Sequence, residues 1–376
     1  MLKIITLLSI LSCLVDGLII PSQKRDNPVP LKLDFTVQRK ANGTSQLNRH
    51  IMKRGSYPET ITDVGDVSYN LNVYLGSNQQ PSYVMIDTGS SDLWVTSQTY
   101  SASSSSSSQD TGNPFNIQYL DGTSENGEWY LDTLTFDPGN PPTINDFQFA
   151  VIQGNDQGGQ GVLGIGDRNT ESSNTPYNNL PWALANNGIT PKASYSLFLG
   201  PDGGQGSLIF GGIDTDKYLG TLQKYPIDTA SGPGLFVNVA SISVDGKSFS
   251  SNQPYLLDSG TSLGLVQQDV QDYLDEIFKP TLVKQGDITY RQVSCDQPTD
   301  KYIKFNFGEN TIALSYADAI ENDGSGQCLL GFTSYDNNNI LGDVFLRKAY
   351  VYYDLTDQSI SIAQALYSDS SNIISA

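Results

Sequence analysis

Two short motifs place a carboxylate at the end of an apolar run, on a turn of small hydroxyl residues. The first, Asp-Thr-Gly-Ser-Ser, begins at Asp87, and the second, Asp-Ser-Gly-Thr-Ser, begins at Asp258. Two adjacent carboxylates cannot both ionise cheaply, so they share one proton, with one pKa lowered and the other raised. The ionised group can then take a proton from water while the protonated group hydrogen-bonds the carbonyl under attack. The motifs therefore indicate hydrolysis by an activated water, without a covalent intermediate.

The motifs are part of a longer repeat. Each is followed by an apolar-Leu-Gly element, GVLGIG around Leu163 and NILGDVF around Leu341. Matched elements in the same order at similar spacing imply an internal duplication with halves of about 160 residues. Pseudo-two-fold packing of the halves would bring Asp87 and Asp258 together. The glycine after each Asp allows turn conformations and close approach.

The part of the chain after the leader, residues 55–376 (the body), lacks residue types that several classes of catalytic site require. The single histidine, His50, lies in the N-terminal leader, which excludes Ser-His-Asp and Cys-His catalysis and histidine-based zinc sites from a processed chain. Outside the leader there are two cysteines, Cys295 and Cys328. In an oxidising compartment they most simply form one disulfide, although two free thiols are the alternative.

The leader has the features of a secreted precursor. One Lys precedes a short apolar run, which predicts a signal peptide over residues 1–17. A pro-segment is expected over 18–54, because the dibasic pair Lys53-Arg54 lies just before a change in composition. Its Asn42 is the one N-linked glycosylation site in the chain. We expect a secreted protein without a membrane anchor.

Charge divides the chain at the same place. Residues 1–54 hold nine of the 21 Lys and Arg residues but three of the 40 Asp and Glu residues. A basic pro-segment on an acidic body suggests association by charge attraction, which weakens at low pH. The acidic body argues against nucleic-acid binding.

The remaining sequence predicts an all-β protein. Alternating runs such as SYNLNVYLG, NIQYL, GEWYLDTLTF, SLIFGG and AYVYYDL indicate strands separated by Gly, Pro, Asn and Asp turns. Short helices are expected in TPYNNLPWALANNG and VQQDVQDYLDEIFK, and the run SASSSSSSQD predicts a mobile surface loop. We expect two β-barrel-like lobes, residues 55–225 and 226–376, each carrying one motif and facing a central cleft.

These motifs resemble those of the pepsin-type aspartic endopeptidases, peptidase family A1. The stretches VMIDTGSSDLWV, LLDSGTS, YLDGTS and NILGDVFLRKAYVYYDL are most similar to the secreted yeast enzymes of the candidapepsin kind, over residues 55–367. The resemblance implies a bilobal pepsin-like fold, polypeptide substrates, sensitivity to pepstatin-like inhibitors and a zymogen that binds its own pro-segment. It also implies a monomer with no cofactor and no metal.

The resemblance assigns roles to particular residues. Asp87 and Asp258 match the catalytic pair. Thr88 and Ser259 match hydroxyls that join the two loops, and Ser90 and Thr261 match hydroxyls that bond the carboxylates. Tyr119 matches a flap tyrosine, and Trp94 matches its hydrogen-bonding partner. Positions that bind substrate backbone match Gly89, Gly260, Asp121, Gly122 and Ser262. The later family disulfide matches Cys295–Cys328.

Two departures from the family pattern bear on function. Many relatives have a disulfide in the loop after the first motif, where this chain has the serine run. Relatives usually have Gly after the flap Tyr, where this chain has Leu120, which affects flap flexibility and the neighbouring pocket. The alternatives to an acid endopeptidase are a catalytically silent relative that binds another protein, and, more distantly, a carbohydrate-binding sandwich. The intact Asp, Gly and Tyr positions favour the enzyme.

Overall fold

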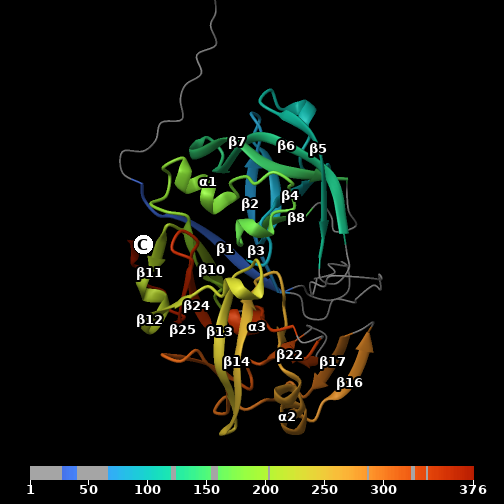
Figure 1. Cartoon of the computed structure of the whole chain (residues 1–376), viewed down its shortest axis with the longest axis vertical. Helices are drawn as coiled ribbons and strands as arrows, with labels where there is room; N and C mark the ends of the chain where they lie inside the picture. Colours follow the sequence, from blue (N-terminus) through green and yellow to red (C-terminus); the bar gives the residue numbers. More distant parts are fainter. Residues whose placement is uncertain are drawn as a thin grey trace, which may run out of the picture.

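The computed structural model describes residues 28–39, 67–119, 124–153, 160–201, 204–285, 288–322, 327–335 and 338–376. Within these ranges two lobes, each dominated by strands, lie one above the other (Figure 1). Several sequence predictions fall outside the described residues, namely the signal peptide, Asn42, Lys53, Arg54, Leu120, Asp121 and Gly122.

The first lobe is a curved sheet. Its strands are β2 (Val67–Leu75), β3 (Gln80–Asp87), β4 (Leu93–Thr96), β5 (Gln109–Gln118), β6 (Ser124–Asp137), β7 (Asn140–Ile152) and β8 (Gly161–Gly164). They pair in the order β2-β3-β8-β4-β7-β6-β5, and β6 also pairs with β2, so the sheet closes on itself. Closure leaves fewer unpaired edges, and the inward face forms a barrel-like core.

The second lobe repeats this plan. Its main strands are β13 (Phe236–Val244), β14 (Lys247–Leu257), β15 (Gly264–Leu265), β18 (Tyr302–Asn306), β19 (Thr311–Ser315), β22 (Phe332–Thr333) and β23 (Ile340–Leu341). A smaller sheet contains β16 (Thr281–Gln285), β17 (Ile288–Val293), β20 (Ile320–Asn322) and β21 (Cys328–Leu330).

A shared sheet joins the lobes. It contains β12 (Tyr218–Pro226), β25 (Ser359–Ala365), β24 (Ala349–Asp354), β9 (Ser194–Phe198), β10 (Gln205–Phe210) and β1 (Leu31–Arg39), paired in that order. Strands β9 and β10 come from the first half and β24 and β25 from the second. The expected division between the lobes at residues 225/226 lies at the end of β12, which is also a strand of this sheet. A short pair, β11 (Gly212–Asp214) with β26 (Ile373–Ser375), lies beside it.

The repeat seen in the sequence corresponds to the same strand pairing in both lobes. Strand β3, which ends at Asp87, runs parallel to β8 with Ile86 opposite Leu163. Strand β14, which ends before Asp258, runs parallel to β23 with Leu257 opposite Leu341. Each Leu-Gly element is thus the strand beside its own Asp motif.

Helices are few among the described residues. They are α1 (Leu180–Asn186), α2 (Gln268–Phe278) and α3 (Asp343–Leu346), with 3₁₀ turns η1 (Ala102–Ser104), η2 (Arg168–Thr170), η3 (Thr215–Lys217) and η4 (Thr229–Ser231). Both expected helices are confirmed, and α2 buries Val270, Leu274 and Phe278 at the spacing of one helix face. The single turn α3, which begins within NILGDVF, was not among the expected helices. No helix in the described ranges is long and apolar enough to cross a membrane.

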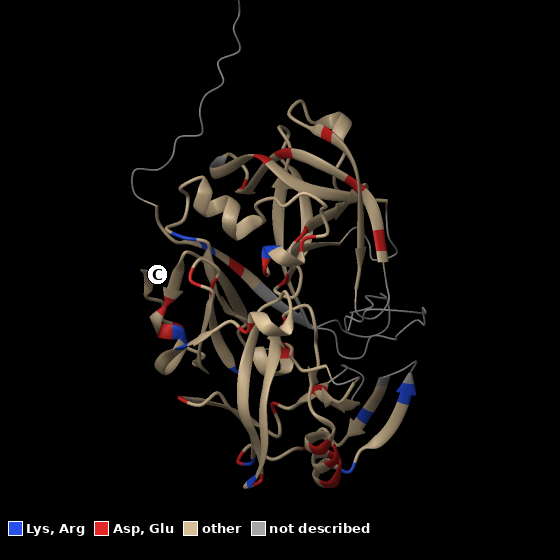
Figure 2. Ribbon diagram, in the orientation of Figure 1, with Lys and Arg blue, Asp and Glu red and all other residues tan. Residues whose placement is uncertain are grey.

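The two body cysteines form the predicted disulfide. Cys295 and Cys328 are bonded, and their Cα atoms are 5.2 Å apart. The bond ties the segment after β17 to the start of β21 in the small sheet. This sheet carries basic residues on β16 and β17, whereas α2 beside it is acidic (Figure 2).

The serine run is not the mobile loop that its composition suggested. Ser105 is buried, and its Oγ accepts a hydrogen bond of 2.9 Å from the backbone N–H of Ser77. The buried carboxylate of Asp132 on β6 accepts from Tyr100 OH at 2.7 Å and from Ser107 Oγ at 2.6 Å. Hydrogen bonds from hydroxyls thus fix the loop to the barrel at the place where many relatives have a disulfide.

We expect Asp132→Ala to free this loop and to lower the free energy of unfolding by about 2–3 kcal/mol, because Tyr100 OH and Ser107 Oγ lose the buried carboxylate that accepts from both of them. Urea denaturation measures the stability, and limited proteolysis between residues 101 and 108 measures the loop. Asp110→Ala, at an exposed carboxylate, is the matched control. Equal stability and equal proteolysis of the Asp132 and Asp110 variants would show that the network does not anchor the loop.

Candidate active site

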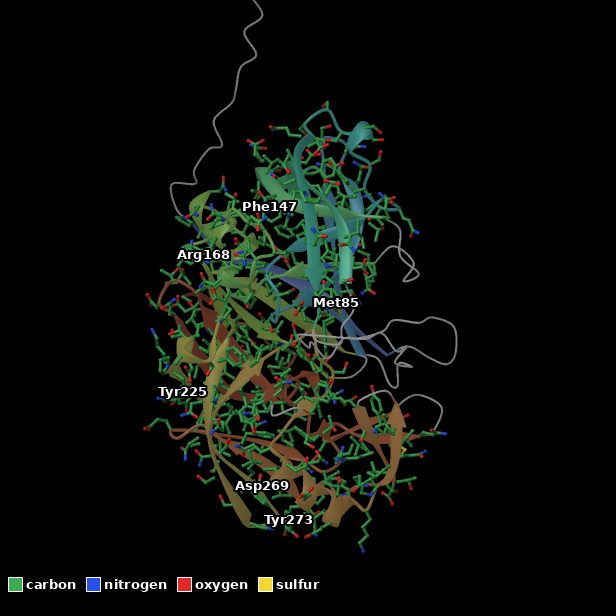
Figure 3. All side chains as sticks on the ribbon, turned by 45° about the vertical axis from the view of Figure 1, so that its right-hand side comes forward. Met85, Phe147, Arg168, Tyr225, Asp269 and Tyr273 are labelled. Atoms are coloured by element: carbon green, nitrogen blue, oxygen red, sulfur yellow. A yellow bond between two sulfur atoms is a disulfide. The ribbon has the colours of Figure 1, made fainter. Side chains whose placement is uncertain are left out.

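The two Asp motifs meet where the lobes join. Asp87 is 4% exposed at the end of β3, and Asp258 is 1% exposed just after β14. Met85, two residues before Asp87, lies near this junction, whereas Asp269 and Tyr273 of α2 lie at the far end of the second lobe (Figure 3). Strands that run in parallel with their Leu-Gly partners therefore aim both carboxylates at the same place.

Each loop packs its glycine against the opposite carboxylate. A Cβ atom on Gly89 would lie 2.5 Å from Asp258 Oδ1, and one on Gly260 would lie 2.5 Å from Asp87 Oδ1 and 3.1 Å from Asp258 Oδ1. Contacts below 3 Å are forbidden to real side chains, so only glycine fits at these two positions. The glycines thus set how closely the carboxyl groups approach each other.

Two hydroxyls cross-link the loops with matching hydrogen bonds. Thr88 Oγ1 donates to Leu257 O at 2.8 Å and accepts from Ser259 N at 2.9 Å. Ser259 Oγ donates to Ile86 O at 3.0 Å and accepts from Thr88 N at 3.2 Å. All four bonds are buried, where a satisfied polar network is rigid. These hydrogen bonds connect the end of β3 in the first lobe to the end of β14 in the second lobe.

The carboxylates are oriented by donors from their own loops. Asp87 accepts from the backbone N–H of Gly89 at 2.8 Å and from Ser90 Oγ. Asp258 accepts from Gly260 N at 2.8 Å and from Thr261 Oγ1 at 2.6 Å. Each Asp therefore has one oxygen bonded to a backbone N–H and the other to a hydroxyl.

The site holds a proton more tightly than an exposed carboxyl group does. Burial, and next the neighbouring Asp87 carboxylate, raise the pKa of Asp258 to about 7, against the hydrogen bonds that favour its charged form. Since interacting acids titrate as a pair, this proton belongs to the dyad as a whole. One carboxyl of the pair is thus protonated at acid pH, as general acid–base chemistry on a carbonyl requires.

Tyr119 and Trp94 also lie together. Trp94 Nε1 donates to Tyr119 OH at 2.5 Å, and both side chains belong to an apolar cluster with Met85 on the first-lobe side of the dyad. Tyr119 directly follows strand β5, at the turn end of the β5/β6 hairpin. The hydrogen bond therefore fixes the turn end of this hairpin beside the segment that follows the Asp87 loop.

The other predicted substrate contacts are less fully placed. Ser262, the last residue of the second motif, is half-buried, and its carbonyl accepts from Val344 N of α3 at 3.2 Å. Asp121 and Gly122, on the far side of Tyr119, lie outside the described residues.

Sequence analysis missed two residues at this site. Asp92, five positions after Asp87, is fully buried and accepts from Tyr177 OH at 2.7 Å. The signal was present as an asymmetry of the repeat, because the equivalent position after Asp258 is the apolar Leu263. A charged residue in one copy alone points to a partner that the other half lacks.

The described residues contain no group of three or more His, Cys, Asp and Glu side chains that could bind a metal ion.

Comparison with known proteins agrees with this geometry. The family model for eukaryotic aspartyl proteases matches residues 68–365. The chain belongs to this family. Aspartyl proteases are hydrolases, and a carboxyl pair that shares a proton is the general signature of this enzyme class.

The relatives narrow the subfamily. Candidapepsin of Candida tropicalis is 39% identical over 382 residues, covering 95% of this chain and 94% of the relative. Secreted aspartic protease 3 of Candida albicans is 37% identical over 388 residues, covering 94% of each. The resemblance to the candidapepsin group is thus confirmed over almost the whole aspartyl protease chain.

A solved structure confirms the pepsin-like fold. The crystal structure of an aspartic proteinase from Irpex lacteus superposes with a TM-score of 0.67 and 23% identity, over 81% of this chain and 96% of that one.

We expect Thr88→Val to lower both activity and stability. The change keeps the shape of the side chain but removes the hydroxyl bonded to Leu257 O and Ser259 N, at a cost of about 2 kcal/mol in unfolding free energy. Misaligned carboxylates should lower kcat/KM about tenfold or more. Thr215→Val, which removes a half-buried hydroxyl bonded to Asn372, is the control. Full activity of the Thr88 variant on an acid casein assay would contradict a role in aligning the dyad.

Proposed function

We propose that the protein is a secreted acid endopeptidase, made as a zymogen, that hydrolyses peptide bonds of proteins with a water activated between Asp87 and Asp258. The observation that carries this proposal is the reciprocal packing of Gly89 and Gly260 against the opposite carboxylates. Coupled acids so close together retain one proton and can bind one water between them.

The chemical steps follow from this arrangement. The ionised carboxyl takes a proton from the water, which attacks the peptide carbonyl carbon, while the protonated carboxyl hydrogen-bonds the carbonyl oxygen. The tetrahedral intermediate then collapses as a proton is delivered to the leaving nitrogen. Ser90 and Thr261 keep the carboxylates oriented throughout, and Tyr119 lies on the hairpin that would close over the substrate.

The reaction should depend on acid conditions. Because the pKa of Asp258 is raised, the active singly protonated pair persists well above the usual carboxyl range and is lost as pH rises through about 7. Bonds flanked by bulky apolar residues are the expected substrates, given the apolar cluster around Met85, Trp94 and Tyr119 beside the dyad.

A zymogen is supported by the part of the predicted pro-segment that the structure describes. Strand β1 pairs with β10, Leu31 opposite Phe210, and with β2, Val37 opposite Tyr69, and it buries Phe35. Residues 31–39, which belong to the expected pro-segment, are therefore part of the sheet that joins the lobes. Cleavage after Arg54 would cut its covalent link to the body.

A binding protein without activity remains the alternative. It is disfavoured because silent relatives often lose a dyad Asp, a neighbouring Gly or the flap Tyr, and all of these are present here.

We expect the processed protein to digest unfolded casein at acid pH and to be blocked by pepstatin. Asp87→Asn should reduce kcat by about 10³-fold or more, since the pair then lacks its second carboxylate. Circular dichroism should show an unchanged fold in this variant. Proteolysis at the wild-type rate by Asp87→Asn would overturn the assignment.

Processing makes a second expectation. N-terminal sequencing of the protein from culture fluid should begin at Gly55. A variant with Lys53→Ala and Arg54→Ala should accumulate as the longer form, with lower activity at equal protein concentration. The same N-terminus in both proteins would place the processing site elsewhere.

A further inference from the structure

A short connector, residues 171–177 between η2 and α1, is bonded to the Asp87 loop through Asp92. Asp92 Oδ2 accepts from Ser172 N at 2.9 Å, and its Oδ1 accepts from Tyr177 OH at 2.7 Å. At the other end of the same tyrosine, Tyr177 N donates to Glu171 Oε2 at 3.0 Å. The connector is thus fastened by two carboxyl groups that share one tyrosine.

The ring of Tyr177 extends this link to the β5/β6 hairpin. It packs edge-on against Trp129 of β6 with centroids 5.5 Å apart, and Trp129 packs edge-on against Phe115 of β5 at 5.0 Å. Phe115, Trp94 and Tyr119 belong to the same apolar cluster, and Tyr177 packs against it. One residue therefore touches both the loop of the dyad and the hairpin that carries Tyr119.

We propose that Tyr177 is a positioning residue that aligns the β5/β6 hairpin with the Asp87 loop, and that Glu171 restricts this alignment to acid and near-neutral pH. The proposal rests on the proposed function for its link to catalysis, but its structural part does not depend on proteolysis.

Glu171 lies among groups that disfavour its ionised form. Burial is the largest cause, and with the negative charge of Asp92 it raises the pKa of Glu171 to about 7, against the Tyr177 N–H and Arg168. The other ionisable neighbours that face it are Asp167 of η2 and the phenol of Tyr177. The guanidinium of Arg168 lies 4.3 Å from the centroid of the Trp182 ring.

The carboxyl oxygens of Glu171 differ in their surroundings. Oε2 accepts the Tyr177 bond, whereas Oε1 is buried without a hydrogen-bond partner among the described residues. A neutral carboxyl tolerates such a place far better than a carboxylate does. Burial raises the pKa of Asp92 as well, so a second charge beside it is doubly unfavourable.

The sign of the pH effect follows from these shifts. A carboxyl whose pKa is raised in the folded state binds more protons folded than unfolded, so stability falls as pH rises from the usual glutamate range towards about 7. Above that pH Glu171 is charged, and the connector is the part of the site that loosens. The hairpin then loses its alignment while the rest of the barrel remains.

The first test is Tyr177→Phe, which keeps the ring on Trp129 but removes the bond to Asp92. We expect KM for a peptide substrate to rise about three- to tenfold at pH 4, with kcat within about twofold, because loss of the buried bond to Asp92 misplaces the hairpin that covers the substrate. Tyr225→Phe, which removes a hydroxyl bonded to Asn310 at 2.6 Å, is the control and should leave KM unchanged. Unchanged KM in the Tyr177 variant, or a fall in kcat alone, would overturn the positioning role.

The second test is Glu171→Gln, which can still accept from Tyr177 N but cannot ionise. The midpoint of the change in tryptophan fluorescence with rising pH, to which Trp129 beside Tyr177 contributes, should move upward by about half a unit or more relative to wild type. The exposed Glu128→Gln is the matched control and should not move it. A midpoint that stays in place, or moves down, would refute the role of Glu171. This readout needs no catalysis, so it remains decisive even if Asp87→Asn shows the proposed function to be wrong.

Discussion

The site depends on the reciprocal fit of two loops in which each glycine backbone lies against the carboxylate of the other loop. With a Cβ atom on Gly89 or Gly260 the carboxyl groups would be forced apart, and with a greater separation they would titrate as independent acids. The strand pairs β3/β8 and β14/β23 set the height of the loops. The buried bonds of Thr88 and Ser259 set their lateral position.

Because the site is built from two similar loops, much of its arrangement could be predicted from the sequence. The Asp motifs and the Leu-Gly elements are local patterns. Their repetition indicated two similar halves, and in each half the strand before the Asp pairs with the Leu-Gly strand. The two longer helices and the main strands follow from periodicity. The bond between Cys295 and Cys328 followed from counting cysteines. Such features depend on near neighbours in the chain or on composition.

The missed features depend on contacts between distant residues. A run of serines looks mobile until Asp132 and Ser77, far away in sequence, are known to face it. The helical turn α3 forms because the Asp343 N–H and Val344 N–H bond to carbonyls of the second motif. Tyr177 received no role from its place in TPYNNLPWALANNG, and its bond to Asp92 spans 85 positions. No local pattern records these pairs.

The layout of the shared sheet has a consequence for synthesis on the ribosome. The first lobe contains no cysteine between its strands, so it can fold as it emerges without waiting for an oxidant. The shared sheet cannot, because β24 and β25 are translated only after the strands of the second lobe. A chain stopped before them would contain both Asp motifs but would lack two strands of the sheet that joins the lobes.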